Sequence, residues 1–306
     1  MSKYGMPYKG NKSKIVEQLI EVLPPAENFY DLFMGGGAVT HRALLSNKWR
    51  NFVCNDLNPL VVKAWNMAVR GEFRNEKRWI SREDFFRLKD TDPYVAICFS
   101  FGNDLKSYAY DKDIEKWKYA MHRAVVDSDY LPMQKLGGVD LSGISGNLTQ
   151  RRLMATNIVV QHCQTEKDKV RIQHHERLQS LVALQSLQRL ESLQRLESLQ
   201  RLESLQRHYK NVPIRPHSVL YCDIPYKDTN EYKTTGRFDY GEFYDWCERQ
   251  TEPVFINSYE MPSDRFDCVA EWRTICKLSA TNNSQEVVEK LFVPKNQKER
   301  GNIGLF

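Results

Sequence analysis

Short apolar runs alternate with longer amphipathic segments near both ends of the chain, and this alternation predicts strands and helices. The apolar runs predict strands at residues 28–33, 51–55, 218–222, 253–257, 272–278 and 287–293. The amphipathic segments predict helices at residues 12–22, 41–47 and 59–69, the first of which is closed by Pro24 and Pro25. Strands that alternate with helices are typical of an α/β fold with a Rossmann-like sheet.

The middle of the chain has a different character. From residue 71 to residue 176 strand signals become rare, and polar helical segments carry interleaved Lys, Arg, Tyr and Trp. Because strand signals resume at Ser218, the two ends of the chain are predicted to build one sheet that an insertion splits. We therefore expect a sheet domain from residues 1–70 and 208–306, a mainly helical insertion at 71–176, and a separate repeat segment at 177–207.

The repeat segment has an unusual leucine spacing. Ten leucines occupy every third position from Leu178 to Leu205, and residues 190–207 are three identical copies of LESLQR. An α-helix turns 300° in three residues, so the leucine stripe would wind round the helix rather than stay on one face. The residue types favour helix, and we expect one continuous helix about 42 Å long. Such a helix is either a spacer or self-association arm, or a tolerated surface expansion; the sequence leaves both open.

Composition narrows the class of protein. With 306 residues, 41% of them hydrophobic, the chain can bury an α/β core and carry an inserted domain. Its net charge of +5 suits a nucleic-acid partner, because phosphate contacts supply much of the affinity for nucleic acids. Seven dispersed cysteines without a CxxC pair predict a reducing cytoplasm and no zinc site. No signal peptide is expected in residues 1–14, and no apolar stretch is long enough to cross a bilayer.

A glycine turn follows the first predicted strand. Gly35 and Gly37 lie between this strand and a helix, where glycine lets the backbone approach a ligand closely. Asp56 follows the next strand, 19 positions after Gly37, where an acid can hold ribose hydroxyls. Thr40 replaces the third glycine of the dinucleotide fingerprint, so a ligand without a pyrophosphate, such as S-adenosylmethionine, fits better than NAD. A glycine turn without a ligand is the alternative.

The tetrapeptide Asp223-Ile224-Pro225-Tyr226 directly follows another apolar run. The Asp223 carboxylate and the Ile224 carbonyl can both accept hydrogen bonds from an exocyclic amine, and Pro225 fixes the backbone after them. Tyr226 offers a ring face on which a flat heterocycle can stack. An ordinary turn at the end of a strand would also suit these residues.

Four segments in this order resemble the Dam-like class of DNA adenine methyltransferases. They are residues 7–12 (PYKGNK), 31–37 (DLFMGGG), 55–59 (NDLNP) and 221–226 (YCDIPY), and residues 287–292 are similar to the closing strand of that family. The resemblance implies an S-adenosylmethionine-dependent methyltransferase sheet, with the insertion as a target-recognition domain. The chain departs from the family pattern at Ile224, where the family usually has proline. The backbone carbonyl is present with either residue.

The resemblance also implies an activity and its residues. The expected reaction is methyl transfer from S-adenosylmethionine to N6 of an adenine turned out of duplex DNA, with no metal and no covalent intermediate. The implied catalytic residues are Asp223, Ile224, Pro225 and Tyr226, and the implied cofactor residues are Tyr8, Lys12, Asp31, Phe33, Gly35, Gly37, Asp56, Asn58 and Asp223. Lys12 is expected near the cofactor carboxylate. The resemblance also implies a bacterial or phage enzyme, which can belong to a system with a restriction endonuclease partner.

Two other classes stay open on the sequence alone. A methyltransferase acting on RNA or on protein glutamine can share an acid–x–proline–aromatic turn, and an inactive relative could bind DNA without transferring a methyl group. DNA reading is expected from basic and aromatic residues of the insertion, although a solvated helical face is the alternative. These residues are Phe99–Asp104, Lys106, Tyr108, Tyr110, Lys116, Lys118, Tyr119, His122, Arg123 and Asn147–Arg152.

Overall fold

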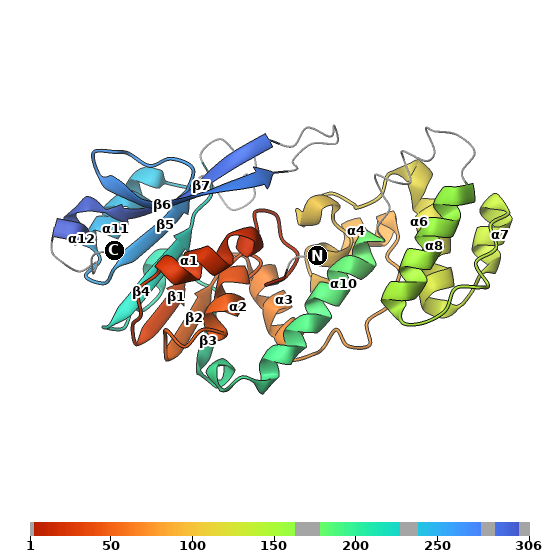
Figure 1. The fold of residues 1–306 in the computed structure, drawn as a ribbon, viewed down its shortest axis with the longest axis horizontal. Helices are drawn as coiled ribbons and strands as arrows, with labels where there is room; N and C mark the ends of the chain where they lie inside the picture. Colours follow the sequence, from red (N-terminus) through yellow and green to blue (C-terminus); the bar gives the residue numbers. More distant parts are fainter. Residues whose placement is uncertain (1–2, 163–177, 227–237, 277–284, 300–306) are drawn as a thin grey trace. The chain divides into compact units, whose positions relative to one another are not determined.

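The computed structural model describes residues 3–162, 178–226, 238–276 and 285–299. These residues form two compact units (Figure 1). The helical unit comprises Pro7–Lys9 and Met67–Glu191, and the sheet unit comprises Ser2–Met6, Gly10–Asn66 and Ser192–Phe306. The chain therefore enters the sheet unit, leaves it after Asn66 and returns to it at Ser192.

The described residues build one seven-stranded sheet with the order β3-β2-β1-β4-β5-β7-β6. The strands are β1 (Asn28–Asp31), β2 (Asn51–Asn55), β3 (Leu202–Leu205), β4 (Ser218–Asp223), β5 (Val254–Ser258), β6 (Phe266–Cys276) and β7 (Gln285–Pro294). Strands β1 to β5 run parallel to one another, whereas β7 runs antiparallel to both β5 and β6. This arrangement confirms the predicted Rossmann-like α/β sheet.

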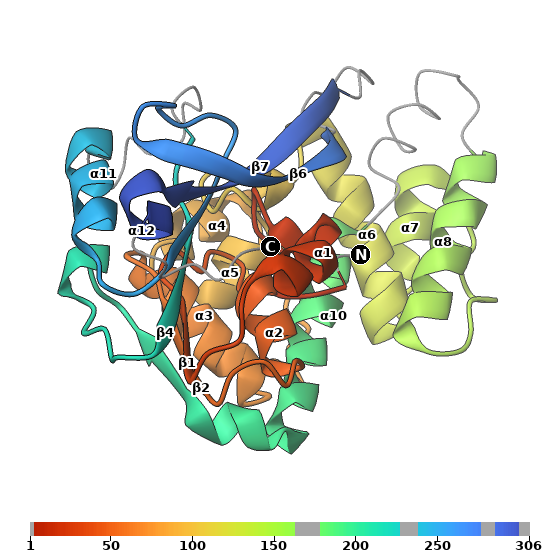
Figure 2. The ribbon, with the colours of Figure 1, turned by 60° about the vertical axis from the view of Figure 1, so that its left-hand side comes forward.

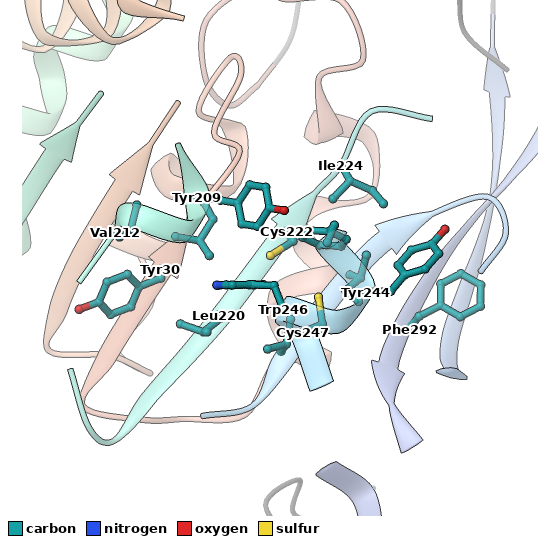
Figure 3. Packing of buried hydrophobic residues seen from close by; sticks show 14 of the residues in the cluster. Tyr30, Tyr209, Val212, Leu220, Cys222, Ile224, Tyr244, Trp246, Cys247 and Phe292 are labelled. Carbon is teal, nitrogen blue, oxygen red and sulfur yellow. The ribbon is translucent and has the colours of Figure 1, made fainter. Parts of the chain in front are cut away.

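Strands β1, β4 and β5 lie in the middle of the sheet, and nearly all their residues are buried. A parallel strand covered on both faces needs a continuous apolar run rather than an alternating one, which is why these runs were readable in the sequence. On one face, side chains of β1, β4 and β5 pack against α11 (Tyr240–Arg249) (Figure 3). Leu220 and Cys222 of β4 and Trp246 and Cys247 of α11 belong to this core.

Helices cover both faces of the sheet. The short helix η1 (Lys12–Lys14), α1 (Val16–Val22) and α2 (Ala38–Leu44) lie on the face opposite α11 (Figures 1 and 2). α12 (Lys295–Glu299) is held to the α11 side by Gln297, whose amide donates to the carbonyls of Gln250 and Glu252. α3 (Pro59–Val69) has the bounds that the sequence predicted.

The strand order reverses between β1 and β4. β1 pairs with β2 on one side and with β4 on the other, so the connections that leave β1 and β4 run in opposite directions. Ligands of open α/β sheets bind at such a switch point, at the carboxyl ends of the strands. Asp31 ends β1 and Asp223 ends β4, so the two predicted motifs meet at this edge.

The helical unit confirms that the insertion is mainly helical among the residues described. It contains α4 (Arg82–Leu88), α5 (Pro93–Cys98), η2 (Phe101–Asn103), α6 (Lys112–Asp127), α7 (Leu131–Gly137), α8 (Leu148–His162) and α10 (Gln179–Arg189). Its core includes an aromatic cluster in which the Trp79 ring stacks on Tyr110 at 5.5 Å and meets the His122 ring at its edge.

The single helix expected across the leucine repeat is wrong. The three LESLQR copies take different structures: η3 (Leu190–Arg195), η4 (Glu197–Arg201) and the edge strand β3. A 3₁₀ helix has three residues per turn, so leucines at every third position stay on one face, which an α-helix cannot achieve. Leu190 and Leu193 are accordingly both 1% exposed. The third copy instead pairs with β2 in the sheet.

The remaining element boundaries shift by a few residues. β1 ends at Asp31, α2 starts before His41, and β6 starts at Phe266 rather than at Trp272. Residues 277 and 278 of the strand predicted there lie outside the described residues, as does Cys163. Within the described part of the chain, no helix combines the length and the apolar character that crossing a membrane requires.

Candidate active site

The glycine turn between β1 and α2 is fixed by its packing. Gly37 caps α2 with φ of 67°, and a Cβ there would lie 2.6 Å from the ring of Trp65 on α3. The N-terminal segment also closes on the turn, because the Met6 amide donates to the Gly36 carbonyl at 2.6 Å. Only glycine at position 37 satisfies both the left-handed backbone and the contact with α3.

Asp31 is buried at the end of β1. Its Oδ2 accepts hydrogen bonds from the Thr40 hydroxyl at 2.7 Å and from the Thr40 amide at 3.2 Å. Burial raises the pKa of Asp31 to about 7, against the lowering effect of the Thr40 hydrogen bond. Its Oδ1 has no hydrogen-bond partner among the described residues. A buried acceptor without a donor is a candidate contact for a ligand amine or hydroxyl.

Asp56 follows β2 and is tied to the glycine turn. Its Oδ2 accepts from the Gly35 amide at 2.9 Å, and its Oδ1 accepts from the Asn58 amide at 2.8 Å. Asn58 in turn accepts from the Leu60 amide, in the first turn of α3. Burial raises the pKa of Asp56, and these two backbone hydrogen bonds oppose that rise. Each carboxylate oxygen keeps a lone pair for a hydroxyl group of a ligand.

These residues fit an S-adenosylmethionine cradle. Asp31 offers a free acceptor beside the glycine turn, and Asp56 presents its carboxylate at the next strand end, the place for ribose hydroxyls. Phe33 is half-buried, and its ring lies 5.5 Å from the ring of Tyr209 and 6.0 Å from that of Phe238. Tyr8 belongs to the helical unit and is half-buried there.

Asp223 ends β4 and forms an ion pair with Lys12. The Lys12 Nζ lies 2.9 Å from the Asp223 Oδ1 and also donates to the Gly10 carbonyl at 3.1 Å. The surrounding protein raises the pKa of Asp223 to about 6, the Lys12 ammonium opposes this rise, and the Glu289 carboxylate adds to it. Lys12 was expected near the cofactor carboxylate; in this structure its partner is the predicted catalytic acid.

The residues on either side of Asp223 hold it rigidly. Cys222 is fully buried in the sheet, as expected for a strand residue, and Ile224 is 3% exposed within the core beneath the site (Figure 3). The Tyr240 hydroxyl donates to the Pro225 carbonyl at 2.9 Å. The isoleucine that replaces the usual proline therefore gains its restraint from side-chain burial instead of from a ring.

Tyr226 is held by two residues that the sequence did not single out. Its hydroxyl donates to the Glu289 Oε2 at 2.7 Å and accepts from the Asn257 amide at 3.0 Å. The Lys12 ammonium lies 5.0 Å from the centre of the Tyr226 ring, and the Tyr259 ring lies at 4.2 Å. The available signals were modest: Asn257 ends an apolar run, and Glu289 interrupts the run from Val287 to Phe292.

Much of the expected DNA-reading set is buried in the helical unit. Phe99, Ser100, Tyr108, Tyr110, Lys118, His122 and Arg152 are each at most 6% exposed, so the prediction that they face DNA is wrong. They belong to the interior of the helical unit, where their aromatic rings and aliphatic stems are buried. Arg151 donates to the Ala124 carbonyl near the end of α6, a structural role. Phe101, Lys106, Lys116 and Tyr119 remain exposed.

A family comparison bears directly on this site. Residues 8–131 match the family model described as D12 class N6 adenine-specific DNA methyltransferase. The match confirms the predicted family resemblance. It also confirms the predicted class of enzyme, an adenine-specific DNA methyltransferase, while the matched range ends before the Asp223–Tyr226 segment. No curated protein matches the chain. Among the residues described, no group of three or more His, Cys, Asp or Glu is placed to hold a metal ion.

Proposed function

We propose that this methyltransferase transfers a methyl group from S-adenosylmethionine to N6 of an adenine turned out of duplex DNA. The observation that carries the proposal is the meeting of two acids at one sheet edge. Asp31 and Asp223 end the neighbouring strands β1 and β4. Along the chain, the glycine turn follows β1, and Ile224–Tyr226 follow β4. A cofactor and a base bound at these two places would share the switch point of the sheet.

Each residue of the second motif has a proposed role. The Asp223 carboxylate and the Ile224 carbonyl accept hydrogen bonds from the two N–H groups of the amine, which directs the nitrogen lone pair toward the reacting methyl. The one proton that the nitrogen loses on methylation would pass to the Asp223 carboxylate. When bound, S-adenosylmethionine supplies that methyl on a positively charged sulfur, so no further activation of the donor is needed. Tyr226 offers its ring to the base and offsets part of the cost, a few kcal/mol, of removing adenine from the duplex.

The Lys12 ammonium lies where the target base is proposed to bind. Its ammonium makes the ion pair with Asp223 and lies over the Tyr226 ring, the two interactions that the adenine amine and ring would make. Adenine binding therefore requires the ammonium to withdraw from Asp223. Two acceptors are near enough to receive it, the Gly10 carbonyl at 3.1 Å and the Glu289 Oε2 at 3.9 Å.

DNA contacts are proposed for the exposed side chains of the helical unit. Phe101 is 53% exposed at the start of η2, and Lys106 is exposed just beyond this helix. Lys116 and Tyr119 are exposed on α6. Cationic and aromatic side chains of this kind contact phosphates and bases respectively.

The experiment that tests this function compares substrates. Purified protein is incubated with tritiated S-adenosylmethionine and either unmethylated duplex DNA, single-stranded RNA or a glutamine-containing protein extract. Label in the duplex DNA supports the proposal. Label only in RNA or protein would overturn it, and DNA binding without transfer to any substrate would identify an inactive relative.

A further inference from the structure

Three side chains form a closed hydrogen-bonded triangle beside Asp223. The Tyr226 hydroxyl donates to the Glu289 Oε2 at 2.7 Å, the Asn257 Nδ2 donates to the same oxygen at 2.6 Å, and this Nδ2 also lies 3.0 Å from the Tyr226 hydroxyl. Glu289 is 13% exposed and Asn257 is fully buried. Charge-assisted hydrogen bonds to a shielded carboxylate are stronger and more directional than neutral ones.

The triangle links a connecting segment to rigid strands. Tyr226 lies three residues beyond the end of β4, whereas Asn257 belongs to β5 and Glu289 to β7. Asn257 is the register partner of Asp223 on one side and of Leu291 on the other. Residues of two strands therefore fix the orientation of the Tyr226 ring, through the hydroxyl group of that tyrosine. Support from strands is more precise than support from loops.

The triangle includes features that lower the stability of the folded protein, which suggests a functional reason for it. The Asn257 Oδ1 is buried and has no hydrogen-bond partner among the described residues, because the amide is oriented by the two bonds of its Nδ2. A buried acceptor left without a donor destabilises the folded state. The Glu289 carboxylate also raises the pKa of the nearby Asp223. Burying a carboxylate next to another acid is a feature of functional sites.

We propose that Glu289 and Asn257 are positioning residues that fix the Tyr226 ring in the orientation required for stacking on the target adenine. The proposal rests on the proposed function, because it assigns these residues to the same methyl transfer. Glu289 acts through the Tyr226 hydroxyl, and Asn257 holds the Glu289 carboxylate in place. Neither side chain needs to touch the base or the cofactor.

The test is a double-mutant cycle on single-turnover methylation of unmethylated genomic DNA. Glu289→Ala and Tyr226→Phe each remove one end of the hydrogen bond, and each is expected to slow the methyl-transfer step about 10- to 100-fold. Because the Tyr226 hydroxyl is proposed to act through its bond to Glu289, the double variant should be no slower than Glu289→Ala alone. Glu289→Gln keeps an acceptor for the hydroxyl and should recover most of the rate.

Controls separate positioning from a general effect of removing a charge. Glu271→Ala removes an exposed carboxylate from the neighbouring strand β6, at the register partner of Lys290, and should leave the rate unchanged. The KM for S-adenosylmethionine should stay within about twofold of wild type in every variant, since only the transfer step is affected.

Two results would overturn the proposal, and they are distinguishable. If wild-type protein methylates DNA but the effects of Glu289→Ala and Tyr226→Phe multiply, the two side chains act independently and only the positioning role fails. If the wild-type protein forms no N6-methyladenine in DNA, the proposed function fails and the positioning role fails with it.

Discussion

Local sequence predicts the structure at the ends of β1 and β4, but it does not predict the structure of the LESLQR repeat. At the strand ends, short motifs fold as their composition predicts, because apolar runs, a glycine turn and strand-ending acids all favour one arrangement. In the repeat, one hexapeptide forms two stretches of 3₁₀ helix and one edge strand. Propensity is identical in the three copies, so tertiary contacts decide the outcome.

Each copy makes a different set of contacts. In the first copy, Glu191 pairs with Arg74 of the helical unit. In the second, the Ser198 hydroxyl donates to the carbonyl of Leu44, at the end of α2. In the third, Ser204 accepts a hydrogen bond from the Cys54 thiol of β2 at 3.3 Å, within the parallel ladder. A repeat can therefore supply a necessary strand without any strand signal of its own.

The largest effect is expected at the strand ends. Asp223→Ala removes one of the two proposed acceptors for the target amine, the charged one, and should lower methyl transfer by at least about 10³-fold, a loss at the upper part of the range for a positioned catalytic group. Equilibrium dialysis should show that S-adenosylmethionine still binds. Asp264→Ala, an exposed carboxylate outside the site, serves as the matched control. Full activity of Asp223→Ala would refute the assignment.

The next largest effect is expected on stability, and it distinguishes the first copy of the repeat from the second. Leu193 and Leu199 occupy the same place in successive copies, but Leu193 is 1% exposed and Leu199 is only half-buried. Leu193→Ala should cost about 2–5 kcal/mol of unfolding free energy, and Leu199→Ala about 1 kcal/mol. Urea denaturation measures both. Equal losses would show that the copies are equivalent and that the observed burial is not what stabilises the protein.

A smaller effect concerns the pH dependence of the strand-end site. Asp223 must be ionised to accept the amine hydrogens, and its pKa is about 6, so the rate should rise with pH through about 6 and then level off. Lys12 lowers this pKa, and Lys12→Met should therefore move the rise to higher pH. Lys14→Met, an exposed residue of the same short helix, should not. If Lys12→Met does not change the pH profile, Lys12 does not control the ionisation of Asp223.

The smallest effect is expected from shortening the repeat. Deletion of Leu196–Arg201 leaves two identical copies, enough to continue α10 and to supply β3. The melting temperature should fall, because only two copies remain to make the contacts that three copies make now. The transfer rate should persist, since the bonds that hold Asp223 and Tyr226 come from Lys12, Asn257 and Glu289 and not from the repeat. Loss of transfer with cofactor still bound would show that the repeat does more than complete the sheet.

Sequence reasoning located the sheet and both motifs, because a buried parallel strand leaves an uninterrupted apolar run and because glycine and proline are needed where they occur. It missed β3, whose pattern is that of a helix former. It also missed Glu289 and Asn257, since their local signals are weak and the pairing of β5 and β7 is what brings them to Tyr226. Conversely, it assigned Lys118 and His122 to a surface, although packing buries both.

Identification of the methylated nucleoside tests whether Asp223 supports methyl transfer to N6 of adenine. Unmethylated duplex DNA is incubated with tritiated S-adenosylmethionine and either wild-type protein or the Asp223→Ala variant, then digested to nucleosides and separated by chromatography. Wild-type protein should place label in N6-methyladenine, and the variant should place none there. Label in a cytosine derivative, or equal labelling of adenine by both proteins, would contradict it.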